Sequence, residues 1–239
     1  MTSSPDVHER MQTLADRWEA KDDKRCIFLG CYTLMTGNML AALDRDEFHD
    51  SPWVRQLLAH FAQYYFDALD AFERNDPATS AVWRVAHEAA ARHHTMTLQH
   101  LFLGVNAHIN YDLALTVVDM LEDAWQQMPH TQRVQRYEDY CLVNEIIART
   151  IDEVQDQVIR RHSPVLGLVD VLTGRLDERV IVHQIAKWRE QVWEFAVSLL
   201  EFPRGERRDN IVALIEAMAL ERSDAILFRE GLASFKHLA

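Results

Sequence analysis

Residues 50–77 read DSPWVRQLLAHFAQYYFDALDAFERNDP. Large apolar residues recur in this stretch every three or four positions, at Trp53, Leu57, Phe61, Tyr64, Tyr65, Ala68 and Phe72. Such spacing places them on one face of an α-helix. The run from Asp50 to Pro52 is typical of a helix start, with an Asp cap and a proline in the first turn. The run from Asn75 to Pro77 then predicts the end of this helix.

The same helical spacing extends along the rest of the chain. It predicts further helices over residues 7–20, 24–43, 95–127, 131–161, 177–202 and 208–238, and one capped by Thr79 or Ser80. Seven Gly and six Pro leave long stretches without helix breakers, and no strand-like alternation of useful length occurs. We therefore predict an all-α fold. It would be one bundle of about seven or eight helices over residues 1–239, with a core over 24–200 and a C-terminal helix over 208–238.

Composition and charge restrict the class of partner. The 239 residues are 48% hydrophobic and carry a formal net charge of −12. An acidic protein repels phosphate backbones and anionic headgroups, so we expect neither nucleic acid nor a membrane as a partner. Three cysteines without a C-x-x-C pair favour a reducing compartment. Because we find no signal peptide and no uncharged apolar run of about 18 residues, we expect a cytoplasmic protein.

Residues 100–112, HLFLGVNAHINYD, are the first candidate for a functional site. His100, Gly104, His108 and Asp112 are spaced by four, and residues four apart share one face of a helix. His108 and Asp112 could therefore supply two ligands to a divalent transition metal. Without a metal, the carboxylate would orient the imidazole and raise its basicity, which would make His108 a general base. Both alternatives remain open.

Three further residues of this segment support a site. Gly104 inside a helix costs about 1 kcal/mol relative to Ala, which a helix tolerates where a ligand or another backbone comes close. Asn106 and Asn110 add two amides that are also four apart. Their apolar flanks predict burial, and buried polar groups need partners or ions. Our catalytic candidates are therefore Asn106, His108, Asn110 and Asp112. The alternative is a structural hydrogen-bond network between helices.

A second set of polar residues could face the first. Asp139 and Asn144 lie in a predicted helix, where Asn is unusual beside apolar neighbours. Arg189 lies between Trp188 and Trp193 and could stack on an aromatic ring or hold an anion. Our substrate-binding candidates are Tyr65, Asp139, Asn144 and Arg189. Core packing, a solvated helix face or a structural ion pair are the alternatives for these residues.

These residues resemble a bacterial family catalogued as domain of unknown function 5995. The segment from Leu103 to Leu113 is similar to its Gly-Met-Asn-Ala-His-Ile-Asn-x-Asp-Leu signature, with Val105 in place of the usual Met. Weaker similarity covers about residues 25–200, at Tyr32, Thr36, Phe61, Ala62, Tyr65, Ala68, Trp83, Asp139, Asn144, Arg189 and Trp193. The resemblance implies a shared helical fold and gives no activity.

A fainter similarity concerns the helical zinc phospholipases C and P1-type nucleases, which also bury a His-x-x-x-Asp pair on a core helix. This similarity adds weight to the hypothesis of a metal at His108 and Asp112. This chain lacks the N-terminal Trp ligand of that group, having Met1, and lacks its full ligand order.

Three hypotheses follow from the sequence. The first is a metal-dependent hydrolase that activates water in a buried His/Asp/Asn pocket. The second is a non-catalytic module that binds a small ligand or packs against a second copy of the chain as a homodimer. The third is a purely structural polar network. The sequence leaves open whether the protein is an enzyme, and whether His87, His93, His94, His100 and His183 join the site.

Overall fold

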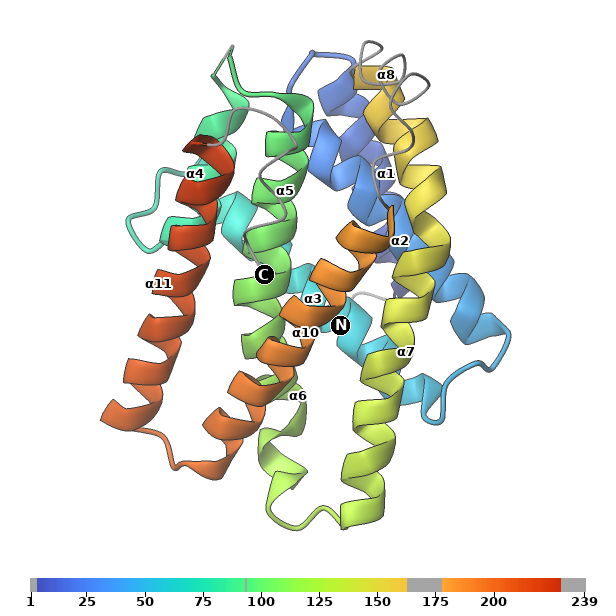
Figure 1. Ribbon diagram of the computed structural model, residues 1–239, viewed down its shortest axis with the longest axis vertical. Helices are drawn as coiled ribbons and strands as arrows, with labels where there is room; N and C mark the ends of the chain where they lie inside the picture. Colours follow the sequence, from blue (N-terminus) through green and yellow to red (C-terminus); the bar gives the residue numbers. More distant parts are fainter. Residues whose placement is uncertain (1–3, 93, 163–177, 229–239) are drawn as a thin grey trace.

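The computed structural model describes residues 4–92, 94–162 and 178–228 (Figure 1). Its longer helices are α1 (Ser4–Glu19), α2 (Arg25–Asp44), α3 (Ser51–Glu73), α4 (Ala81–Ala90), α5 (Thr97–Ala107), α6 (Leu113–Trp125), α7 (His130–Val154), α10 (Glu178–Glu201) and α11 (Glu206–Phe228). The π-helical segment η1 (His108–Asp112) joins α5 to α6, and η2 (Gln155–Ile159) joins α7 to the short α8 (Arg160–His162). These ranges contain no strand, so the predicted all-α bundle is confirmed.

Helix starts follow the predicted capping residues. The Asp50 side chain accepts a hydrogen bond from the Trp53 backbone N–H at 2.9 Å, and Ser80 caps α4 through the Trp83 N–H at 3.2 Å. Each cap satisfies a backbone donor that the first helical turn leaves free. The predicted helices match the observed ones to within a few residues. The last part of the helix predicted to reach residue 238 lies outside the described residues.

The continuous helix α5–η1–α6 lies at the centre of the bundle (green in Figure 1). It packs against α2, α3, α4, α10 and α11, and every residue from His100 to His108 is buried. A helix that is apolar on all sides is stable in water only when neighbours cover it. The polar residues of this segment are therefore held deep inside the protein.

Two helical segments are long and apolar enough to cross a membrane, by length and composition only. They span Arg25–Asp44 and Thr97–Trp125, whereas the sequence led us to expect no such segment. Most of each apolar window, 56% and 83% respectively, is buried inside the bundle. The core helix of a globular protein has the same property.

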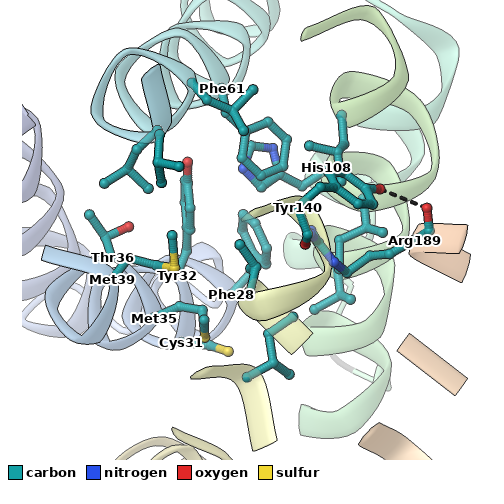
Figure 2. A pocket seen from close by; sticks show the side chains of 18 residues that line it. Phe28, Cys31, Tyr32, Met35, Thr36, Met39, Phe61, His108, Tyr140 and Arg189 are labelled. Atoms are coloured by element: carbon teal, nitrogen blue, oxygen red, sulfur yellow. Dashed lines mark hydrogen bonds between the residues drawn. The ribbon is translucent and has the colours of Figure 1, made fainter. Parts of the chain in front are cut away.

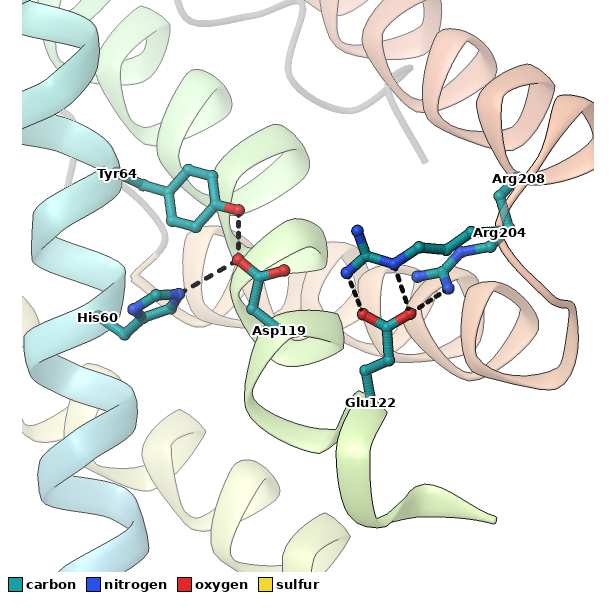
Figure 3. A network of polar contacts seen from close by, with 6 residues as sticks. All are labelled: His60, Tyr64, Asp119, Glu122, Arg204 and Arg208. Carbon is teal, nitrogen blue, oxygen red and sulfur yellow. Dashed lines mark hydrogen bonds and ion pairs between the residues drawn. The ribbon is translucent and has the colours of Figure 1, made fainter.

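A polar network on the surface ties the outer helices to α6 (Figure 3). Asp119 accepts a hydrogen bond from the Tyr64 hydroxyl at 2.7 Å and lies 3.2 Å from His60 Nε2, which connects α3 to α6. Glu122 forms ion pairs with Arg204 and Arg208, which connect α6 to the start of α11. These contacts join α6 to its neighbours and do not involve the buried residues 100–108 of the central helix.

Candidate functional site

His108 and Asp112 form a buried hydrogen-bonded pair. His108 Nδ1 lies 3.0 Å from Asp112 Oδ2, and both side chains are almost fully buried. The indole Nε1–H of Trp83 donates to the same Oδ2 at 2.9 Å. The carboxylate therefore fixes the orientation of the imidazole, and Trp83 fixes the carboxylate.

Burial sets the protonation of the His108–Asp112 pair. It lowers the pKa of His108 well below the usual value, because a charged imidazole would lose its hydration. It raises the pKa of Asp112, and the Trp83 hydrogen bond opposes this shift only in part. We therefore assign a net neutral pair, in which Asp112 Oδ2–H donates to His108 Nδ1. In this arrangement the imidazole carries its own hydrogen on Nε2.

Aromatic rings enclose the imidazole. The Phe61 ring stacks on it, with ring centroids 3.5 Å apart and planes inclined by 8°. Tyr32 approaches edge-on at 4.4 Å between centroids, and Phe28 at 5.9 Å. These rings come from α2 and α3, so the central helix supplies the polar pair and its neighbours supply the apolar shell.

Gly104 makes room for one of these rings. A Cβ atom at this position would lie 2.3 Å from Cγ of Phe28, far inside van der Waals contact. The sequence predicted a close approach at this glycine by a ligand or another backbone. The structure shows that a side chain, the Phe28 ring, makes the approach.

The pair lies within the π-helical segment η1. A π-helical turn bonds residue i to residue i+5 and so contains one residue more than an α-helical turn. Such segments are rare and recur at functional sites. No feature that we recognised in the sequence signalled this segment.

A cavity of about 110 Å³ adjoins the imidazole (Figure 2), and we call it the His108 cavity. Residues of α2, α3, α5, η1, α6, α7 and α10 line it, most of them apolar. Two buried polar atoms on its wall, His108 Nε2 and the Tyr32 hydroxyl oxygen, have no hydrogen-bond partner in the described part of the chain. An unsatisfied buried polar group costs about 1–3 kcal/mol, so both atoms are candidates for contact with a bound molecule.

Arg189 lines the same cavity from α10. Figure 2 shows it on one side, with Tyr32 and Met39 of α2 on the other. Its guanidinium donates from Nε to Asn144 Oδ1 and from Nη2 to the Tyr140 carbonyl, both at 2.7 Å. It also lies over the Tyr140 ring, 4.2 Å from the centroid. Arg189 is only 4% exposed, and burial lowers its pKa.

A second cavity, of about 130 Å³, lies beside the first. The two share five lining residues: Cys31, Met35, Val105, Ile109 and Ile147. Aliphatic side chains of α5, α7 and α10 form most of its remaining wall, and the π-helical segment η2 contributes Gln155 and Ile159. Both π-helical segments therefore border this pair of apolar cavities.

Other candidates from the sequence lie outside the His108 cavity. Asn106 donates to the Ala219 carbonyl and to Ser223 on α11, and Asn110 donates to Asn106 Oδ1 at 2.9 Å. The two amides thus bond to each other and to α11, whereas we expected them to join His108 and Asp112 around one pocket.

The second predicted set is also divided. Asp139 accepts from the backbone N–H groups of His49 and Asp50, at 2.7 and 3.0 Å, and so holds the loop before α3. Asn144 reaches the cavity only through its bond to Arg189. Tyr65 is buried beside Trp83, with centroids 5.2 Å apart, and it does not line the cavity.

The remaining histidine candidates that the structure describes lie outside the His108 cavity. His87 and His100 are buried and line a separate polar cleft of about 990 Å³, and each has one ring nitrogen without a partner among the described residues. His94 and His183 are exposed, and His93 lies outside the described residues. Within the described ranges, no three His, Cys, Asp or Glu side chains are grouped so as to hold a metal ion. His108 and Asp112 are thus a pair without a third ligand.

Some residues of the cavity were missed as functional candidates. Phe61 and Tyr32 were noted only for their helical spacing or in the family resemblance, yet they form the wall around the imidazole. Their positions on the inner faces of α2 and α3 were readable from the sequence. Their contact with His108 depends on how these helices pack.

Comparison with known proteins gives a family and no activity. One family model matches residues 5–228, and its description is Family of unknown function (DUF5995). This match confirms the family that the Leu103–Leu113 motif indicated. No curated protein matches the chain, and no solved structure does.

Proposed function

This chain belongs to the Family of unknown function (DUF5995), and we propose that it binds a small, mainly apolar molecule in the His108 cavity. The observation that carries the proposal is the buried Nε2 of His108, which has no partner among the described residues on the wall of an apolar cavity. A molecule with one polar group would satisfy this atom and fill the space with its apolar part. Sites for small molecules commonly combine an apolar cavity with few polar groups.

The His108–Asp112 pair gives this site an acid–base capacity. When His108 Nε2 donates its proton to a bound molecule, Nδ1 can take up the proton of Asp112 Oδ2. The pair then carries one negative charge, which lies on the Asp112 carboxylate. The reverse sequence removes a proton from the bound molecule. The site could therefore bind only, or could also catalyse a proton transfer.

The geometry favours this proposal over a metal-dependent hydrolase. His108 Nδ1 and Asp112 Oδ2 are bonded to each other, and no third ligand of the His, Cys, Asp or Glu type accompanies them in the described ranges. Structural and catalytic zinc sites take at least three protein ligands. Metal-activated water therefore has no support in the arrangement of these residues.

We also propose the cytoplasmic location that we expected from the sequence. A cytoplasmic location agrees with three cysteines that form no disulfide within the described ranges.

A thermal-shift experiment tests the proposal. The probe is 1-octanol, whose chain can extend from the His108 cavity into the second cavity beside it. The variants are Leu57→Trp, which fills the His108 cavity, and Leu214→Trp, which adds the same ring at an exposed position of α11. Octanol should raise the melting temperature of the wild type and of Leu214→Trp, and should have little effect on Leu57→Trp. Equal responses of both variants, or no response of the wild type, would overturn the proposal.

A further inference from the structure

We propose that the bound molecule is an apolar carboxylate, with its head group on Arg189 and its hydrocarbon part in the two adjacent cavities. This inference rests on the proposed function and names the class of ligand. It follows from a positive charge that the fold buries with no carboxylate of the described residues beside it.

Arg189 is a buried cation whose hydrogen bonds to described residues all reach neutral groups. Its two partners are an amide oxygen of Asn144 and the backbone carbonyl of Tyr140. Other arginines of the chain, such as Arg25 and Arg136, form ion pairs at 2.6 and 2.8 Å. Within the described ranges no carboxylate lies within 4 Å of Arg189, although the chain has 37 acidic residues. Buried charges are normally paired, so a missing anion is the simplest partner.

The fold also holds the guanidinium in position. Asn144 and Tyr140 fix one Nε–H and one Nη2–H, and the Tyr140 ring supports the guanidinium plane. The Nη1 group makes no hydrogen bond to any described residue, so it has donors to offer. A planar guanidinium matches a carboxylate better than other anions of this size, because two parallel N–H groups can reach its two oxygens.

The other polar atoms of the cavity favour an acceptor as well. In the net neutral pair, Nε2 of His108 carries a hydrogen, and the Tyr32 hydroxyl can donate its own. A ligand with a cationic head would instead meet the charge of Arg189 at short range. The site therefore selects for negative charge at one end of an apolar molecule.

The volume of the two cavities limits the ligand. A cavity of roughly 150 Å³ holds benzene, so cavities of about 110 and 130 Å³ together admit on the order of ten non-hydrogen atoms. Five shared lining residues place the cavities side by side, so one chain can extend from the first into the second. Octanoate is a ligand of this size, whereas a nucleotide or a long-chain lipid is too large.

Calorimetric titration of the full chain tests the inference with octanoate, 1-octanol and octylamine. The wild type should bind octanoate about tenfold to a hundredfold more tightly than 1-octanol, as expected for a charge-assisted hydrogen bond, and should bind octylamine most weakly. In a series from butanoate to octanoate, each methylene should tighten binding by about fourfold until the cavities are full.

Arg189→Gln should weaken octanoate by the same tenfold to hundredfold and should change 1-octanol by less than threefold. Arg149→Gln removes an exposed arginine that pairs with Glu47, and it should change neither affinity. If Arg189→Gln does not fold, Arg189→Lys and the wild-type ratio of octanoate to octanol still decide the matter, because the ratio needs no variant.

The outcomes separate the two proposals. If octanol binds as well as octanoate and Arg189→Gln changes neither, the carboxylate inference is overturned while the proposed function stands. If neither octanol nor octanoate binds, both fail. Loss of octanoate binding alone in Arg189→Gln supports both.

Discussion

The chain contains two similar trios, one in the core and one at the surface, in each of which an Asp carboxyl meets a His and an aromatic side chain that donates a hydrogen bond. In the core, Asp112 Oδ2 meets His108 at 3.0 Å and the Trp83 N–H at 2.9 Å. At the surface, Asp119 Oδ2 meets His60 at 3.2 Å and the Tyr64 hydroxyl at 2.7 Å (Figure 3).

The two trios differ in burial. His108 and Asp112 have side chains 4% and 2% exposed, whereas His60 and Asp119 are both 41% exposed. Water can form a hydrogen bond with every free polar atom of the surface trio. In the core, only a bound molecule or a trapped water can form one with His108 Nε2. Similar bond lengths therefore say little about function, and the environment of the pair distinguishes a candidate site from a surface contact.

Removing the two carboxylates should give the largest contrast. Asp112→Ala leaves the buried Trp83 N–H without an acceptor and the buried His108 Nδ1 without a donor, at about 1–3 kcal/mol each, so we expect a loss of about 2–6 kcal/mol in the free energy of unfolding. Asp119→Ala should lose at most about 1 kcal/mol. Urea denaturation of both variants measures the difference. Equal losses would show that burial does not set the two trios apart.

The next effect concerns the close packing around the buried trio. Gly104→Ala places a Cβ atom on the Phe28 ring and should destabilise the protein by about 1–3 kcal/mol, despite the better helix propensity of Ala. In a double-mutant cycle, Gly104→Ala should destabilise the Phe28→Ala variant less than it destabilises the wild type. Strictly additive effects of the two substitutions would contradict the contact.

Two other buried histidines sharpen the comparison through pH. Burial lowers the pKa of His87 to about 3 and that of His100 to about 4. The unfolded chain takes up these protons below about pH 6.5, whereas the folded chain resists them until these lower values. Stability should therefore fall as pH drops from 6.5 towards 4, by about 1 kcal/mol per pH unit for each histidine.

The variant His87→Asn tests this pH dependence. Its stability, measured by urea denaturation from pH 8 to pH 4, should fall less steeply below pH 6.5 than that of the wild type. The difference at pH 8 supplies the baseline for lost packing. Parallel profiles would show that His87 charges as readily in the folded protein as in the unfolded one.

The smallest effect is expected at the surface ion pairs of Glu122. Arg204 and Arg208 lower its pKa to about 2, so its contribution is present above about pH 4.5 and is lost as pH falls towards 2. Glu122→Gln should cost at most about 1 kcal/mol at pH 7, and 1 M salt should remove most of the difference. A larger, salt-independent loss would indicate a packing role for this residue.

The local features of the fold could be predicted from the sequence. Asp50 and Ser80 start their helices as capping chemistry requires, and His108 meets Asp112 because a spacing of four brings side chains together. The same rule pairs Asn106 with Asn110.

The sequence also contained the reason why these two pairs face different helices. Each residue of an α-helix advances by about 100°, so His108 lies roughly 200° around the axis from Asn106. Asn106 and Asn110 therefore turn to α11, while His108 turns to α2 and α3. Our prediction that the two asparagines share one pocket with His108 and Asp112 did not take this rotation into account.

Other parts of the site depend on packing that no local pattern specifies. Arg189 reaches Asn144 across 45 positions of the chain, and the Phe61 ring reaches His108 across 47. The cavities are volumes that side chains of several helices leave unfilled, so they have no signature in any one segment. That no described carboxylate lies beside Arg189 could be recognised only from the structure around it.

The π-helical segment η1 contains one residue more than the packing of α5 and α6 in the bundle requires. The spacing of His108 and Asp112 depends on that residue. A deletion of one residue between His108 and Asp112 would let α5 run directly into α6 as an ordinary α-helix, because the extra residue of the wide turn would be gone. The outer helices could keep their contacts with both halves. The imidazole and the carboxylate would then be three positions apart instead of four. A single-codon deletion would thus realign the proton-carrying pair and keep the architecture, because side chains three apart on a helix still lie close but meet at a different angle. The chemistry of this chain can therefore change in a descendant whose fold stays the same.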